Sequence, residues 1–252
     1  MRWWRADLHI HSALSPCASL AMSPARIVRE ARRAGLDLIA VCDHNAAENG
    51  RYVRRLAGEM PVVLMGMEIQ TAEEVEVLAY FMDEESPLLL QEELYQTLPD
   101  VSCDPQLFGD QVVVDETGEI VRHVERLLLS PVPLPLADVV RRIERLGGLA
   151  VPSHVERLPG GLLAVLGLFP EGNWPVAVEI APWTPLADIC LTWPELRQHS
   201  ILRSSDAHYP AEIGRAWTDF RLDAPTLEEI HSAFRNRDGR TLRPSRETKE
   251  EA

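Results

Sequence analysis

Short, nearly continuous apolar segments alternate along the chain with segments whose apolar residues recur every three or four positions. The clearest short segments are LDLIAVCDH at 36–44 and PVVLMGMEI at 61–69. Runs of this kind are typical of strands that are covered on both faces. The pattern predicts further strands at ADLHIH (6–11), VEVLAYF (75–81), LAVPSH (149–154), VAVEIA (176–181) and ILRSSDAH (201–208).

Helices are predicted between these strands. Ser23-Pro24 begins one well, because Ser is a favoured N-cap and Pro suits the first helical position, and Gly35 ends it. Ser86 and Thr226 are expected to cap two others. The predicted helical segments after the first are AAENGRYVRRLAG (46–58), SPLLLQEELYQTL (86–98), LADVVRRIERLGG (136–148) and TLEEIHSAF (226–234).

Alternating strands and helices are the signature of βα units around a parallel sheet. One segment departs from it: FGDQVVVDETGEIVR (108–122) alternates around Asp115–Gly118, as a β-hairpin does. We interpret residues 107–122 as a hairpin insertion in a single domain that covers residues 1–240. The polar residues 241–252 are expected to form a flexible tail.

Composition narrows the class of protein. The 252 residues are 46% apolar, which is enough for a sizeable core, and 25 basic against 39 acidic residues give a net charge of −14. This charge argues against a non-specific nucleic-acid or anionic-membrane surface, although bound cations can reverse the local sign of a phosphate site. Cys17, Cys42, Cys103 and Cys190 form no C-x-x-C pair, and no apolar run reaches membrane-spanning length. We therefore expect a cytoplasmic chain without a disulfide framework or membrane contact, and we leave its oligomeric state open.

Histidines and acids gather where the predicted strands end. In a barrel of parallel strands these ends meet at one rim, where active sites are built. Five of the eight histidines lie there, and residues two apart on a strand share a face. A single histidine at a strand end is more often structural, but the repetition across separate strands favours a metal site. The residues at these ends are His9, His11, Asp43, His44, Glu68, His154, Glu179, Asp206 and His208.

In this arrangement the chain resembles the PHP (polymerase and histidinol phosphatase) superfamily of metal-dependent phosphoesterases. The motifs that carry the resemblance cover nearly the whole chain in the family's order: DLHIHS (7–12), VCDHN (41–45), GMEI (66–69), VPSH (151–154) and SSDAH (204–208). The resemblance implies an α/β fold, a distorted (β/α)7 barrel. It also implies that two or three divalent metal ions, Zn, Mn or Fe, are held at the rim.

The resemblance assigns roles residue by residue. His9, His11 and Asp206 would bind a first metal, Glu68 would bridge it to a second that His154 holds, and His44 and His208 would bind a third. Asp206, His208 and Glu68 form the predicted catalytic group. Asp43 would orient a ligating imidazole from behind.

Two positions depart from the family's pattern. Pro16 and Cys17 stand where members usually carry an Asp or His, and Cys17 is either a thiolate ligand or a small packing residue. Glu76 stands where a histidine usually serves the second metal. It is either a carboxylate ligand or a solvent-facing glutamate.

The predicted function is hydrolysis of a phosphate ester by a metal-bridging hydroxide. Arg157 and Arg215 are candidate phosphate ligands through their planar guanidinium groups. We expect a small phosphate monoester or nucleotide-type substrate and no duplex nucleic acid. Two alternatives stay open: a metal-binding regulatory module with reduced catalysis, and amidohydrolase-like hydrolysis of a non-phosphate bond. The chain has neither a P-loop nor a G-x-S-x-G motif.

Overall fold

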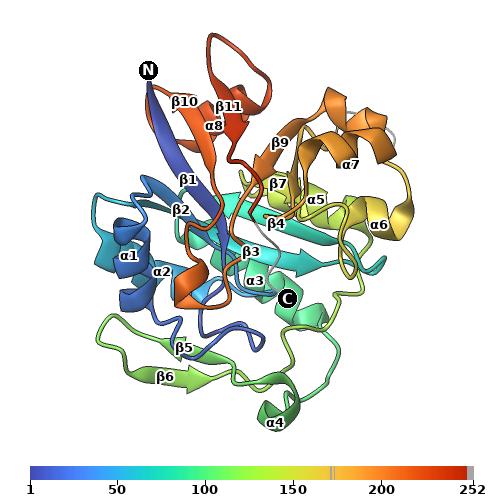
Figure 1. The fold of residues 1–252 in the computed structure, drawn as a ribbon. Coiled ribbons are helices and arrows are strands. Elements are labelled where there is room, and N and C mark those ends of the chain that lie inside the picture. Colours follow the sequence, from blue (N-terminus) through green and yellow to red (C-terminus); the bar gives the residue numbers. More distant parts are fainter. Residues whose placement is uncertain (171, 173, 249–252) are drawn as a thin grey trace.

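Three parallel strands form the centre of a seven-stranded sheet in the computed structural model, which describes residues 1–170, 172 and 174–248. They are β1 (Arg2–Ile10), β2 (Leu38–Val41) and β3 (Val62–Gln70). The sheet has the order β11-β10-β1-β2-β3-β4-β7 and curls into a half-barrel (Figure 1). The predicted α/β class is confirmed, and the curled sheet is consistent with a PHP-type barrel.

The strand β4 (Glu76–Phe81) runs antiparallel to both of its neighbours, β3 and β7 (Leu149–Pro152). The expectation of a uniformly parallel sheet is therefore wrong at this strand. Only residues 71–75 connect β3 to β4, which is too short for the crossover that a parallel pair requires. Because β4 runs backwards, its first residue lies beside the end of β3, where Gln70 pairs with Glu76.

A separate parallel pair continues the curl. It consists of β8 (Ala177–Ile180) and β9 (Ser200–Arg203). The first of these strands contacts β7, and a parallel bridge from Ala207 to Ile10 joins the segment after β9 to β1. The end of β1 therefore lies close to the segment that follows β9, and Asp206 and His208 reach His9 and His11.

Helices cover the outside of the sheet. The predicted segments correspond to α1 (Pro24–Arg33), α2 (Glu48–Ala57), α3 (Glu85–Thr97), α5 (Leu136–Arg145) and α8 (Leu227–Phe234). The side chain of Thr226 caps α8 as predicted. Ser86 does not cap α3: it lies in the first turn, where its N–H donates to Asp83 at 2.6 Å. The remaining helices are α4 (Pro105–Phe108), α6 (Leu162–Leu166), α7 (Leu186–Thr192), η1 (Pro194–Gln198) and η2 (Pro210–Glu212).

The segment around Asp115 forms an antiparallel pair, β5 (Val112–Val114) with β6 (Ile120–His123), at the lower edge of Figure 1. The Asp115 carboxylate accepts hydrogen bonds from the N–H groups of Thr117 and Glu119, which shapes the turn between the strands. The N–H of Val112 donates to the carbonyl of Ala13, so the pair is attached to the loop that follows β1.

Two strands were not predicted: β10 (Thr218–Leu222) and β11 (Thr241–Pro244). The second lies inside the segment that we expected to be a flexible tail, and that expectation is wrong for residues 241–244. Its polar sequence gives little sign of a strand, but backbone pairing with β10 satisfies its N–H and C=O groups. The described part of the chain contains no helix long and apolar enough to cross a membrane. The four cysteines are free.

Candidate metal centre

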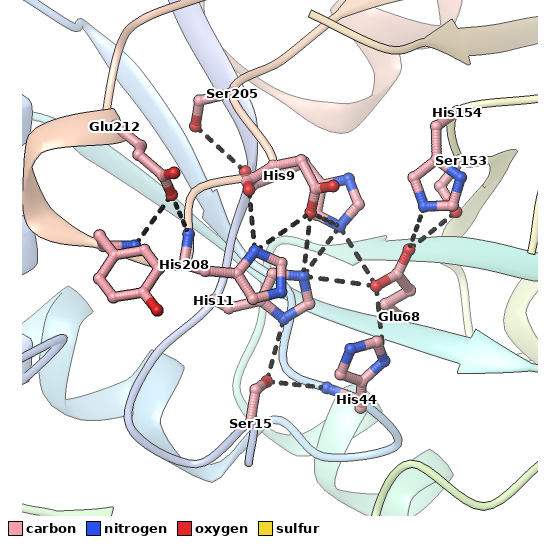
Figure 2. Close-up of polar contacts among 12 residues, drawn as sticks. His9, His11, Ser15, His44, Glu68, Ser153, His154, Ser205, His208 and Glu212 are labelled. Carbon is pink, nitrogen blue, oxygen red and sulfur yellow. Dashed lines mark hydrogen bonds and ion pairs between the residues drawn. The ribbon is translucent and has the colours of Figure 1, made fainter. Parts of the chain in front are cut away.

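The two histidines at the end of β1 point to the same side and form the middle of a cluster of metal-competent side chains (Figure 2). Their Nε2 atoms lie 3.2 Å apart, and both rings are fully buried. Glu68 Oε2 lies 3.3 Å from Nε2 of His9 and 3.4 Å from that of His11. Asp206 Oδ1 lies 3.5 and 3.4 Å from the same two atoms. Four side chains from β1, β3 and the segment after β9 thus converge on one point.

A second half of the cluster lies on the other oxygen of Glu68. His154 Nε2 is 3.3 Å from Glu68 Oε1 and 3.3 Å from Glu76 Oε2. Ser153 Oγ donates to Glu68 Oε1 at 2.8 Å and fixes the carboxylate between the two halves. The backbone of Gly160, at φ +92°, lies so close to Glu76 that an added Cβ would approach Oε2 to 1.8 Å. Glu76 is therefore a buried residue of the cluster and not a solvent-facing glutamate.

A third group is formed by imidazoles alone. The ring of His11 lies 4.8 Å from that of His44 and 4.2 Å from that of His208, measured between centroids. One nitrogen from each of the three rings falls within 4.8 Å of the others. His44 also approaches Glu68 Oε2, at 3.5 Å from its Nδ1.

Hydrogen bonds from behind orient several of these rings. His9 Nδ1 lies 2.9 Å from Glu179 Oε2, His11 Nδ1 lies 3.0 Å from Ser15 Oγ, and His208 Nδ1 lies 2.9 Å from the Asp206 carbonyl. When each Nδ1 carries the proton and donates it to its partner, each Nε2 presents a lone pair. This is the tautomer that a metal-binding imidazole requires.

The donor set fits divalent cations. The described part of the chain contains three groups of three residues whose ligand atoms lie within 4.8 Å of one another inside each group. The groups are His11 with His44 and His208, His9 with His11 and Asp206, and His44 with Glu68 and Glu76. His11 and His44 each belong to two groups. Asp206 Oδ1 and both ring nitrogens of His154 are buried without a hydrogen-bond partner. Buried polar atoms of this kind are ordinarily satisfied, and cations at the cluster would satisfy Asp206 Oδ1 and the Nε2 of His154, which faces Glu68 and Glu76.

Charge is unevenly distributed over the histidines. Burial alone would lower the pKa of His11, but its contacts with Asp206 and Glu68 outweigh burial and raise the pKa to about 9. Burial would also lower the pKa of His9, but the surrounding carboxylates outweigh burial and raise this pKa well above its usual value. The pKa of His44 falls to about 3 and that of His208 to about 4, through burial first. In the absence of metal, protons therefore gather on the two central rings, in the place that a cation would take.

Two residues at the centre have strained backbones. Asp206 has φ +51° and His154 has φ +27°, in the left-handed region that residues other than glycine rarely adopt. Asp7 holds the segment that carries Asp206: its carboxylate accepts from the N–H groups of Ser205 and Gly214, both at 2.9 Å. Strain at a site persists only where the surrounding structure enforces it.

Asp43, which we expected to orient an imidazole, does not touch one. It accepts hydrogen bonds from the N–H and Oγ of Ser12 and from Oγ of Ser15, at 2.6–2.7 Å. Ser15 in turn contacts Nδ1 of His11. Asp43 therefore acts on His11 through a serine.

Sequence reasoning missed the functions of Glu179 and the serines. Glu179 had the right position near a strand end, and a signal was available: it is a carboxylate inside an otherwise apolar strand, VAVEIA. Ser12, Ser15 and Ser153 gave no signal beyond their neighbourhood to the histidines, because serine is common in loops.

Cys17 is brought into none of the three ligand groups in the described part of the chain. The residue is exposed, and desolvation together with the negative charges of Glu68 and Asp206 raises the pKa of its thiol to about 12. The backbone at Gly109, in the hairpin segment, packs closely against the loop that contains Pro16 and Cys17. A Cβ added at Gly109 would lie only 2.0 Å from the Pro16 carbonyl oxygen. The geometry favours a non-ligating Cys17.

The two predicted phosphate ligands differ. Arg157 reaches the centre, where its Nη1 lies 2.7 Å from Asp206 Oδ2 and 30% of its side chain is exposed. Arg215 is engaged elsewhere: its Nε donates to the Ser205 carbonyl and its Nη1 to Glu212. Arg215 therefore stabilises the loop after β9, and the structure does not place it at the phosphate position.

Comparisons with known proteins bear on this arrangement. A family model described as PHP-associated matches residues 195–238. The uncharacterized protein MJ1587 of Methanocaldococcus jannaschii is 32% identical over 92 residues, covering 33% of this chain and 53% of that protein. The lesion-specific endonuclease PfuEndoQ of Pyrococcus furiosus is 18% identical, with a TM-score of 0.67 over 96% of this chain and 58% of its own.

Two further structures are similar. Endonuclease Q in complex with a 27-mer duplex, which has an abasic lesion at the active site, gives a TM-score of 0.69 at 17% identity, over 95% of this chain and 58% of its own. A two-domain Bacteroides vulgatus protein that contains a predicted PHP-like metal-dependent phosphoesterase gives 0.58 at 16%, over 98% of this chain and 65% of its own. These findings support a PHP superfamily domain in this chain. The resemblance inferred from the motifs is confirmed, and the fold is that of metal-dependent hydrolases.

The comparisons also correct one expectation. We expected a small phosphate substrate and no duplex nucleic acid, but a neighbour of the same fold holds duplex DNA at its active site. Our exclusion rested on the net charge of −14. That argument was wrong because cations at a rim attract phosphate whatever the overall charge of the protein. The chain covers little more than half the length of MJ1587 and of PfuEndoQ, at 53% and 58%.

Proposed function

We propose that this chain is a metal-dependent phosphoesterase that hydrolyses phosphodiester bonds in nucleic acid. The observation that carries the proposal is the position of Glu68. One of its oxygens faces His9 and His11, and the other faces His154, each at 3.3–3.4 Å. A carboxylate placed in this way suits a bridge between two cations. Support for the nucleic-acid substrate comes from the similarity to Endonuclease Q.

The ligand set of the proposal is His9, His11 and Asp206 on one side of Glu68, His154 and Glu76 on the other, and His44 with His208 at a third position. Histidine and carboxylate together suit zinc, manganese or iron. Divalent cations held there would lower the pKa of water and neutralise charge on a phosphate. Glu179, Ser15 and the Asp206 carbonyl orient the imidazoles, so the site is organised before substrate arrives.

Arg157 is proposed to bind the substrate's phosphate. It pairs with Asp206 Oδ2 at 2.7 Å, and its buried Nε has no hydrogen-bond partner. When Asp206 binds a cation, the guanidinium of Arg157 can instead donate to a non-bridging phosphate oxygen through its planar N–H groups. Arg157 and His208 both contact Asp206, and their side chains are 30% and 24% exposed, so we expect a substrate to approach the cluster at these residues.

The test begins with protein purified without chelator, in which metal per chain is counted by elemental analysis. Cleavage is then measured on single-stranded DNA, intact duplex and duplex with an abasic site, with added manganese, zinc or iron. A phosphate monoester and an amide substrate are included in the panel. We expect cleavage of a nucleic-acid substrate that disappears on chelation and returns with metal.

The variants Asp206→Asn and His9→Ala should lose both bound metal and cleavage, while Asp100→Ala, at an exposed aspartate, should change neither. Bound metal without turnover on any substrate would replace the proposal with the regulatory module. Cleavage of the amide alone would replace it with an amidohydrolase. Full activity in Asp206→Asn would contradict the ligand assignment.

A further inference from the structure

A surface cavity of about 590 Å³ lies at the opposite end of β8 and β9 from the metal centre. One wall consists of Pro175 and Val176, just before β8, and His199 and Ser200, where β9 begins. The other wall is the end of α8 and the turn after it, residues 234–237, together with Arg197 and Gln198 of η1. The metal-centre residues Glu179 and Asp206 lie toward the other ends of the same two strands.

Three arginines line this cavity: Arg197, Arg235 and Arg237. None of the described residues that line it is acidic, although acidic residues outnumber basic ones in the chain by 39 to 25. Most other arginines form ion pairs with carboxylates. Within the described residues, no carboxylate lies within ion-pair distance of these three. A concentration of positive charge in an acidic protein attracts an anion to this place.

Hydrogen bonds orient one of these arginines and hold the walls of the cavity in position. Arg235 Nε donates to His231 Nε2 at 3.0 Å, so this imidazole acts as a neutral acceptor. Burial and the two neighbouring arginines lower the pKa of His231. Ser200 Oγ donates to the Phe234 carbonyl at 2.8 Å and joins the two walls. His199 is fixed by its Nδ1 contact with the Pro175 carbonyl, also at 2.8 Å.

We propose that this cavity binds a compact polyphosphate anion, such as pyrophosphate or the phosphate chain of a nucleotide. Guanidinium groups present paired N–H donors that match phosphate oxygens, and three of them around one cavity suit a ligand with several negative charges. The volume lies in the range of small-ligand sites. The arginines surround a cavity and do not form a track along the surface, which favours a compact anion over a nucleic-acid backbone. The site is separate from the metal centre and does not depend on its reaction.

Calorimetric titration of pyrophosphate into the full chain, freed of metal with chelator, tests the proposal. The metal-free centre holds Arg157 and the protonated rings of His9 and His11, so an anion bound there is recognised by its lack of response to changes in the cavity. We expect saturable binding of one pyrophosphate per chain. Arg197→Gln and Arg235→Gln should each weaken it by about tenfold or more, the loss that follows when one charge-assisted hydrogen bond is removed. Arg221→Gln is the matched control, because Arg221 is an exposed arginine on β10, outside this cavity.

An equal loss in Arg221→Gln would mean diffuse electrostatic attraction and would overturn the proposal, as would the absence of pyrophosphate binding. A single-stranded oligonucleotide serves as the second probe. If it binds more tightly than pyrophosphate and is weakened by the same two variants, the cavity is a nucleic-acid contact and the compact-anion assignment is wrong. Unchanged thermal unfolding of the variants excludes a folding defect as the cause of a loss.

Discussion

His9 and Glu179, 170 residues apart in the chain, meet in a fully buried contact of 2.9 Å between Nδ1 and Oε2. The contact joins β1 to β8 and directs Nε2 of His9 toward Glu68 and Asp206. It also places a carboxylate behind the centre, where it contacts the imidazole of His9. A carboxylate in this position fixes the tautomer of a ligating histidine and makes the ring a better donor.

Glu179→Gln should therefore lower metal affinity and activity by about 10- to 100-fold, the range found when such partners are changed. The amide oxygen still accepts from Nδ1, so the fold should be kept while the charge is lost. Competition with a chelating dye measures the affinity. The exposed Glu92→Gln on α3 makes the same chemical change far from the centre and should have no effect. Equal affinity in both variants would mean that Glu179 only fills space.

The stability of the metal-free protein should depend strongly on pH. The pKa of His11 is about 9 in the fold, against its usual 6.5, because contacts with Asp206 and Glu68 outweigh burial. A histidine with a raised pKa stabilises the fold fully below pH 6.5, and this contribution is lost as the pH rises through 9. At 1.36 kcal/mol per pKa unit the loss is about 3 kcal/mol.

Urea unfolding at pH 6.5 and pH 9, with chelator and with metal, measures this difference. Metal replaces the protons at the centre, so the decline should be absent or reversed in the loaded protein. A decline of the same size in both states would show that the pH dependence arises elsewhere.

Glu76→Gln should remove metal from the His154 half of the centre. Burial and the nearby charge of Glu68 raise the pKa of Glu76 to about 7, so the metal-free protein should tolerate the neutral amide. A cation between Glu76 and His154 would lose a charged ligand, and elemental analysis should find about one metal fewer per chain. Glu74→Gln, an exposed change two residues away, should leave the count unchanged. A full metal count in Glu76→Gln would mean that Glu76 is not a ligand.

Cys17→Ser should leave both metal content and activity unchanged, because the thiol joins none of the ligand groups formed by the described residues. The serine keeps the size of the side chain, so the loop against Gly109 is not disturbed. Elemental analysis and the cleavage assay measure the two quantities. Loss of one metal would instead show that the thiolate completes the position of His44 and His208.

The sequence by itself determined which residues could form the centre. Histidines and acids two apart at the ends of apolar strands must share a face, because side chains alternate along a strand. His9 with His11 followed from that rule. Asp206 and His208 were predicted by the same rule, but they lie beyond the end of β9, in a loop where Asp206 has φ +51°. Helix positions followed from the 3.6-residue period and from end signals such as Ser23-Pro24 and Thr226.

Only the tertiary structure decided which of these residues meet. Glu76 stands at the beginning of its strand and reaches the rim because β4 runs backwards, a direction that depends on the short connection after β3. Glu179 reaches His9 because side chains from β8 and β1 meet inside the curl of the sheet, and Arg215 turns instead to Ser205 and Glu212. These contacts join residues far apart in the chain. They depend on strand direction and packing, which local side-chain periodicity does not encode.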